Sequence, residues 1–220
     1  MALILNINTA VETASVCLAN DAGVLALAKN EKQKDHAAWL HLAIKDIFEQ
    51  NNLELETVDA IAITGGPGSY TGLRIGMAAA KGICYALNKP LILLNTLQVM
   101  ANAARNESAD LLCPMIDARR MEVFTSIYSK DLQIIKDPAA IELNEKSFDN
   151  ELSTNSICFF GNGSTKFQAI KKNQQAIFST INSDASSMVI LSEEKFKQGE
   201  FADLAYAEPL YLKEFYTPAR

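Results

Sequence analysis

The most informative part of the chain reads Gly65-Gly66-Pro67-Gly68-Ser69-Tyr70-Thr71-Gly72-Leu73-Arg74-Ile75-Gly76. It follows Val58 to Thr64, an apolar run with β-branched residues and the length of a buried strand. It precedes about fifteen residues in which glycine is the only helix breaker. The pattern predicts a strand, a glycine-rich turn and a helix, with Ser69 or Thr71 capping the first helical turn.

This turn has two interpretations, and the sequence leaves both open. The free N–H groups and the positive dipole end of a helix attract anions, so the turn is a candidate phosphate site made by Gly66, Gly68, Ser69, Thr71 and Gly72. Glycine-rich turns are also common as tight connections that bind nothing. A Walker-type ATPase is not indicated, because Leu73 stands where that motif has a lysine.

The composition fits a globular chain. Of its 220 residues 49% are hydrophobic, which is enough for one good core or two small ones. The longest apolar runs have the length of strands, and no basic N-terminal region precedes an apolar segment, so we expect a cytoplasmic protein that does not contact membranes. The four cysteines are scattered through apolar segments, which predicts buried thiols rather than disulfides or zinc ligands: Cys17, Cys84, Cys113 and Cys158.

The negative net charge argues against a protein that binds nucleic acid by itself. The formal net charge is -6, whereas neutralisation of phosphates by basic side chains supplies most of the affinity for nucleic acids. If a nucleic acid is involved, we expect another subunit to hold it.

The two histidines, His36 and His41, do not form a metal motif. They are five positions apart, which on a helix separates them by about 140°, whereas a shared ligand face requires a spacing of four. We therefore predict no metal site in this chain.

The strand pattern occurs twice along the chain. Leu3 to Ile7 is an apolar strand that runs into Asn8, and Leu111 to Ile116 runs into Asp117 in the same way, at an offset of 109 positions. A second glycine turn, residues 161–164, follows in the second half. We expect an internal duplication with two subdomains, 1–105 and 106–220, and the last helix of the second can pack back on the first.

Two predicted helices of the first half carry more apolar surface than one core contact requires. Along Asp35 to Asn51 the apolar residues fill an arc of roughly 180°, against roughly 100° for a single contact. The helix Thr71 to Leu87 is apolar almost all the way round and rich in Gly and Ala, so another helix can come close. The extra surface meets either a neighbour within the chain or a partner protein, and the candidate contacts are Trp39, Leu40, Ile44, Ile47, Arg74, Met77, Ala78, Lys81 and Tyr85.

Residues 65–76 resemble the signature G-P-G-S-[FY]-T-G-[LV]-R-I-G of the TsaB family, formerly called YeaZ. Two shorter segments agree with it. Asp117-Ala118-Arg119 followed by Glu122-Val123 is similar to D-A-R-x-x-E-[VI], and residues 207–212 are similar to A-x-P-x-Y-L. The resemblance implies an α/β chain with the duplicated actin-like, Hsp70-like and sugar-kinase-like fold, made of two mixed sheets with flanking helices.

The resemblance also implies a function. Members of the family are partners of TsaD in forming threonylcarbamoyladenosine (t6A) at adenosine 37 of tRNA, together with the ATPase TsaE. The two apolar helices would pair with TsaD, or with a second copy of this chain as a homodimer, and tRNA would be reached only through the complex. This implies a subunit that positions TsaD and is not itself an enzyme, with no cofactor of its own and with ATP and Mg²⁺ left to the complex.

An enzyme on the same fold is the alternative. It would be a small kinase or ATPase in which Asp117 holds Mg²⁺ and residues 65–72 bind phosphate, although an Asp in a turn is also a common local cap. The family usually reads I-D-T at the first such turn, whereas this chain has Asn8, and the amide removes a hard oxygen anion for Mg²⁺. The older family label, glycoprotease, would require zinc ligands on one face and a general base, and the sequence shows neither.

Overall fold

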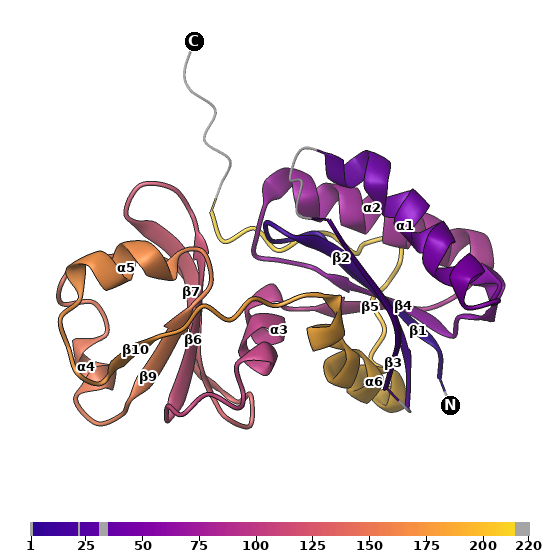
Figure 1. Cartoon of the computed structure of the whole chain (residues 1–220). Helices are drawn as coiled ribbons and strands as arrows, with labels where there is room; N and C mark the ends of the chain where they lie inside the picture. Colours follow the sequence, from indigo (N-terminus) through magenta and orange to yellow (C-terminus); the bar gives the residue numbers. More distant parts are fainter. Residues whose placement is uncertain (1, 22, 31–34, 214–220) are drawn as a thin grey trace, which may run out of the picture. The chain divides into compact units, whose positions relative to one another are not determined.

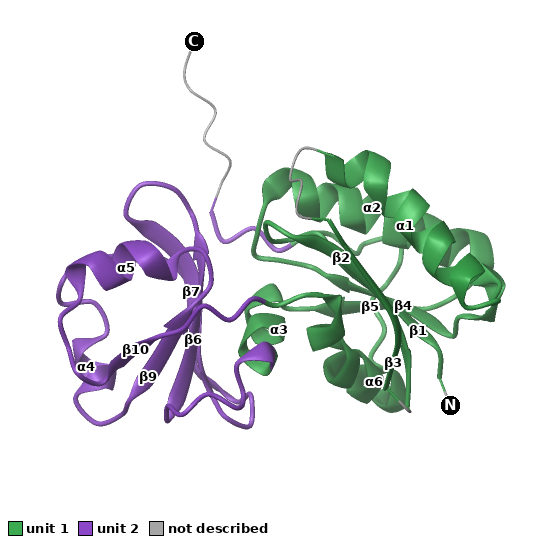
Figure 2. Cartoon of the chain, in the orientation of Figure 1, with its two compact units in different colours: residues 1–102, 183–209 green, residues 103–182, 210–220 purple. Residues whose placement is uncertain are grey.

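The computed structural model describes residues 2–21, 23–30 and 35–213 (Figure 1). The chain divides into two compact units (Figure 2): the described residues within 1–102 and 183–209 form the first, and residues 103–182 with 210–213 form the second. Each unit contains one five-stranded mixed sheet. The last helix, α6 (Val189–Gln198), belongs to the first unit, where it contacts β1 and β5.

The sheet of the first unit has the strand order β3-β2-β1-β4-β5. Its strands are β1 (Ile4–Asn8), β2 (Ala14–Asn20), β3 (Gly23–Asn30), β4 (Ala60–Thr64) and β5 (Leu91–Leu94). The first three form an antiparallel meander, while β4 pairs parallel to both β1 and β5. The carboxyl ends of β1, β4 and β5 therefore lie at one edge, where the glycine-rich turn begins.

Helices cover both faces of this sheet. Leu5 and Ile7 of β1 point into a core cluster with residues of α1 (His36–Gln50) and α2 (Tyr70–Leu87), and Figure 1 shows these two helices side by side over one face. The short helix η3 (Ala185–Met188) and α6 cover the other face. The connections contain η2 (Leu55–Thr57) and α3 (Thr96–Ala103).

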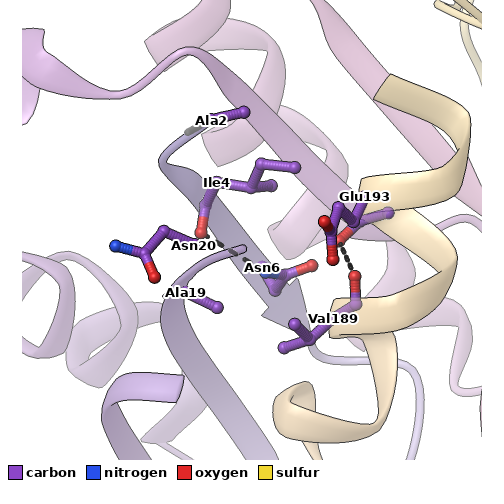
Figure 3. Close-up of a pocket in the computed structure, with 8 residues that line it drawn as sticks. Ala2, Ile4, Asn6, Ala19, Asn20, Val189 and Glu193 are labelled. Atoms are coloured by element: carbon purple, nitrogen blue, oxygen red, sulfur yellow. Dashed lines mark hydrogen bonds between the residues drawn. The ribbon is translucent and has the colours of Figure 1, made fainter. Parts of the chain in front are cut away.

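The contact between α6 and the sheet is close-packed. Ile4 and Asn6 of β1 face Val189 of α6 across a cavity of only about 10 Å³ (Figure 3). A space of this size is too small for an organic ligand, so this face of the sheet is a packing surface.

The sheet of the second unit repeats the order of the first. It runs β10-β9-β6-β7-β8, with strands β6 (Leu111–Asp117), β7 (Glu122–Ser129), β8 (Ile134–Glu142), β9 (Ile157–Phe160) and β10 (Ala176–Phe178). Here β6, β7 and β8 form the antiparallel meander, and β9 pairs parallel to both β6 and β10. Two short helices accompany it, α4 (Asp149–Leu152) and α5 (Ser164–Ile170). The repeated topology confirms the duplication that the sequence predicts.

An aromatic cluster forms the core of the second unit. Phe159 and Phe167 lie edge to face with ring centroids 4.9 Å apart, and Phe148 lies 5.4 Å and 5.5 Å from them. Tilted and edge-to-face pairs of this kind are favoured over face-to-face stacking of aromatic rings.

Local details differ from the sequence prediction at the shortest elements. Hydroxyl capping preferences favour Thr96 as the cap of α3, but Asn95 Oδ1 accepts the hydrogen bonds of the Leu97 N–H at 2.9 Å and the Gln98 N–H at 3.3 Å. Preferences for hydroxyl caps therefore place this cap one residue too late in the chain. The short elements α4 and β10 also carry too few residues for a periodic signal.

Within the described part of the chain, none of the helices combines the length and the hydrophobicity that crossing a bilayer requires.

Candidate protein-binding surface

The glycines of the turn and of α2 let the helix approach the connection between β1 and β2. A Cβ atom at Gly68 would lie 2.3 Å from the Ala10 carbonyl oxygen, and one at Gly72 would lie 2.0 Å from the Thr9 carbonyl oxygen. Real Cβ atoms do not come this close to backbone oxygens. The Ser69 N–H donates to the Ala10 oxygen at 2.8 Å, which fixes the contact.

Gly76 continues the same close approach one helical turn further on. A Cβ atom there would lie 2.2 Å from Thr9 Oγ1 and 2.8 Å from Ile63 Cδ1. The Thr9 hydroxyl uses this space to donate to the Gly72 carbonyl oxygen at 2.8 Å. Gly72 and Gly76 are four residues apart and form one stripe on α2, and the protein itself fills the space over this stripe and over Gly68 of the turn.

The candidate phosphate residues thus have structural partners. Ser69 Oγ accepts from the Gly72 N–H at 3.3 Å and caps α2, and the Gly66 oxygen accepts from the Thr96 N–H at 2.9 Å. Gly66 has a φ of 114°, which favours glycine, and Thr71 is exposed. Packing accounts for these residues, and the phosphate site stays a prediction.

Asn8 is a buried structural residue at the end of β1. Its Oδ1 accepts from the Thr64 hydroxyl at 3.0 Å and from the Ala10 N–H at 3.2 Å. The side chain is fully buried. Asn8 therefore ties β1 to β4 and to its own turn.

Asp117, the equivalent residue of the second unit, stabilises its own turn through hydrogen bonds to its carboxylate. Its Oδ1 accepts from Lys166 Nζ at 2.9 Å and from the Arg119 N–H at 2.6 Å. Partial burial acts to raise the pKa of Asp117, but the bonds from Lys166 and Arg119 outweigh it and hold the pKa below its ordinary value. Lys166 also donates to the carbonyl oxygens of Arg120 and Glu122. This geometry is that of a local cap.

The four cysteines confirm the prediction of buried thiols. All are free and buried, and burial is the main reason that their thiols have raised pKa values. The pKa is about 12 for Cys17, Cys84 and Cys113 and about 11 for Cys158. Nucleophilic or metal-binding chemistry needs the thiolate, so these residues are packing residues.

Side chains that could share a metal ion do not gather in the described ranges. No group of three or more His, Cys, Asp and Glu residues there has a suitable arrangement. His36 is buried at the start of α1, whereas His41, further along the same helix, is exposed.

An apolar groove of about 470 Å³ runs between α1 and α2. Every residue that lines it except His41 is apolar: Ala37, His41, Leu55, Ile75, Ala78, Ala79, Gly82, Ile83, Ala86 and Leu87. Ala78, Gly82 and Ala86 are exposed and four residues apart, so they form a stripe along α2. A Cβ atom at Gly82 would have nothing within 4 Å, in contrast to one at Gly76.

Four of the predicted contact residues lie in the core instead. Leu40 is fully buried, and Ile44, Ile47 and Met77 are at most 5% exposed within the core cluster of the first unit. Because these side chains do not reach the surface, a partner cannot contact them directly. A helical wheel gives the angle of a side chain but not which side the sheet covers.

The other predicted contact residues reach the surface. Tyr85 is 84% exposed, and Ala78 lines the groove. Arg74 stacks over the Tyr70 ring at 4.2 Å, Trp39 is half-buried against the core, and Lys81 binds backbone carbonyls of residues 205 and 207. The remaining groove residues are not among these candidates, and only the pairing of the two helices shows that they share one groove: Ala37, His41, Leu55, Ile75, Ala79, Gly82, Ile83, Ala86 and Leu87.

The fold and the groove define a class of protein. Two units with the same strand order, each a meander followed by parallel strands, make this a chain of duplicated actin-like fold. A Pseudomonas aeruginosa protein with similarity to the peptidase YeaZ has the same fold, with a TM-score of 0.86 and 24% identity over 97% of this chain and 100% of that one.

Sequence comparison narrows this class. The family model for TsaD, the tRNA N6-adenosine threonylcarbamoyltransferase, matches residues 25–212. The tRNA threonylcarbamoyladenosine biosynthesis protein TsaB of Escherichia coli is 28% identical over 96% of this chain and 94% of its own length. The TsaB of Buchnera aphidicola subsp. Baizongia pistaciae is 31% identical over 86% of this chain and 87% of its own length. The chain belongs to the TsaB family, formerly YeaZ, of tRNA threonylcarbamoyladenosine biosynthesis proteins.

Proposed function

We propose that this chain is a non-catalytic subunit that binds TsaD through α1 and α2 and positions it for threonylcarbamoyl transfer to adenosine 37 of tRNA. The ATPase TsaE acts with the complex, and the setting is the cytoplasm. The observation that carries the proposal is the apolar groove between α1 and α2.

The groove suits a helix of a partner protein. Ala78, Gly82 and Ala86 offer no long side chains, so a partner helix can approach the backbone of α2 closely. Exposed apolar surface of this kind is unfavourable in water and marks protein-binding sites. A partner that fills the groove removes this surface from water.

The residues that are candidates for binding Mg²⁺ or phosphate support a non-catalytic role. Asn8 and Asp117 are held by hydrogen bonds within their own units. The glycines of the turn and of the start of α2 are packed against Ala10 and Thr9. These residues would otherwise be the first candidates for Mg²⁺ and phosphate. The net charge of -6 supports a complex in which another subunit holds the tRNA.

The same surface also suits a second copy of this chain when TsaD is absent. A symmetric pair would bury the two grooves against each other, as an isologous interface requires. Homodimer and heterodimer would then exclude one another.

The substitution Gly82→Glu tests the proposal. The position has room for a side chain, and Glu is a better helix former than Gly, so we expect the variant to fold normally. A carboxylate in the groove should abolish binding to TsaD, measured by calorimetry, and tRNA modification by TsaD and TsaE. The matched control is Ile190→Glu on α6, which covers the opposite face of the sheet, and it should bind normally. Wild-type affinity of Gly82→Glu would overturn the proposal.

A further inference from the structure

The segment that follows α6 is fixed to the surface of the first unit. The Ala202 N–H donates to the Leu91 carbonyl oxygen at 2.8 Å, in an isolated bridge to β5. Asp203 Oδ1 then accepts from the N–H groups of Ala205 at 2.8 Å and Tyr206 at 3.3 Å. The Ala207 N–H donates to the Asp203 carbonyl oxygen at 2.8 Å. The backbone of residues 202–207 is therefore held in one conformation without being part of a helix or a sheet.

Lys81 of α2 pins this segment to the helix. Its Nζ donates to the carbonyl oxygens of Ala205 at 3.3 Å and Ala207 at 3.0 Å. These carbonyls stand on either side of Tyr206. Leu204 and Ala207 pack against the core cluster of the first unit, so the segment extends the surface next to α2.

Two tyrosines stand out from this surface. Tyr206 is 84% exposed, and Tyr85, one helical turn beyond Lys81, is also 84% exposed. Both project from backbone that is held in place, so burying their rings costs little conformational freedom. Tyr is a frequent anchor residue in protein interfaces because it combines a large apolar ring with a polar tip.

We infer that residues 202–207 form a third element of the docking surface beside α1 and α2, and that Tyr206 is an anchor for the partner. This inference rests on the proposed function, and the occupant is the threonylcarbamoyltransferase TsaD. The family model of that transferase matches residues 25–212, so the partner has the same type of fold and can offer its own helices to this face.

The charges beside Tyr206 favour a different chain over a second copy. Asp203 and Glu208 are exposed on either side of it. In a symmetric pair that meets at this element the carboxylates would approach their own copies, which is unfavourable. A different partner can supply Lys or Arg side chains around a pocket for the tyrosine ring.

The test is the affinity of Tyr206→Ala for the TsaD of the same organism, measured by calorimetry. We expect a loss of roughly tenfold or more, as for an anchor residue, with an unchanged melting temperature because the side chain is exposed. Tyr206→Phe, which keeps the ring, should retain most of the affinity. The matched control is Ile190→Ala on α6, which also removes an exposed apolar side chain and should have no effect.

Lys81→Met provides the second variant. Met has an unbranched side chain of similar length but no ammonium group, so both hydrogen bonds to the segment are lost. The ring of Tyr206 is then no longer held in position. We expect a loss of affinity comparable to that of Tyr206→Ala. The double variant should then be hardly worse than either single one, because both changes remove the same contact.

The outcomes separate the inference from the proposed function. If Gly82→Glu abolishes binding while Tyr206→Ala binds as well as wild type, the segment is not an anchor and only this inference fails. If Tyr206→Ala weakens self-association but not TsaD binding, the occupant is a second copy and the inference is overturned. If the wild-type chain does not bind TsaD, the proposed function itself is contradicted.

Discussion

Gly76 and Gly82 lie on the same helix but have opposite surroundings. A Cβ atom at Gly76 would collide with Thr9 and Ile63, whereas one at Gly82 would meet nothing. We expect Gly76→Ala to destabilise the protein by about 1–3 kcal/mol through overpacking. Gly82→Ala should instead stabilise it by up to about 1 kcal/mol, because glycine is a poor helix former. Urea unfolding of both variants measures the difference, and equal effects would contradict this account of the glycine stripe.

His36 makes stability depend on pH. Its ring is only 6% exposed, and burial lowers its pKa below the ordinary 6.5, more than the Glu12 carbonyl and the Asp35 carboxylate raise it. The folded state thus disfavours the protonated ring. Stability from this group is full above about pH 6.5 and falls as the pH drops from there through the lower folded pKa.

The variant His36→Gln should remove this dependence. We expect its unfolding free energy to change less between about pH 7 and 5 than that of the wild type, measured by urea unfolding at several pH values. Parallel profiles for the two proteins would show that the histidine is not buried in its neutral form.

At the scale of single elements, the sequence predicts where α1 and α2 lie along the chain but not which of their faces are buried. The apolar arc of α1 indicates that the helix is covered, yet it does not say that the sheet takes Leu40 and Ile44. On α2, two stripes of small residues look alike in the sequence. The stripe of Gly72 and Gly76 is packed against Thr9 in the turn after β1, whereas the stripe through Gly82 is open. Only the packing of distant segments separates them.

The segment after α6 is another feature that the sequence does not predict. Residues 207–212 match a family pattern, but nothing local says that residues 205 and 207 bind Lys81. This contact joins positions more than a hundred residues apart. Periodicity has no information about such contacts, because it describes only the face of one helix or strand.

At the scale of the whole molecule, the duplication is visible in the sequence because each half starts with the same pattern. An apolar strand ends in a polar turn at Asn8 and again at Asp117, and the two sheets have the same order. That α6 belongs to the first unit is harder to predict from the sequence than the duplication is. It depends on contacts with β1 and β5 that lie far away in the chain.

The lone chain should not respond to nucleotide. The turn glycines are packed against Thr9 and Ala10, and Asp117 is engaged by Lys166, so we expect millimolar Mg-ATP to leave the melting temperature unchanged. A ligand that binds the folded state must raise it. A rise that grows with nucleotide concentration would favour the alternative of an ATP-binding enzyme.

Reconstituted tRNA modification tests the central claim most directly. TsaD and TsaE are incubated with tRNA, ATP and a donor of the threonylcarbamoyl group, with and without this chain. We predict that t6A forms when the chain is present, and that omitting it or replacing it with Gly82→Glu reduces t6A to background. Undiminished modification without the chain would contradict its role as the subunit that positions TsaD.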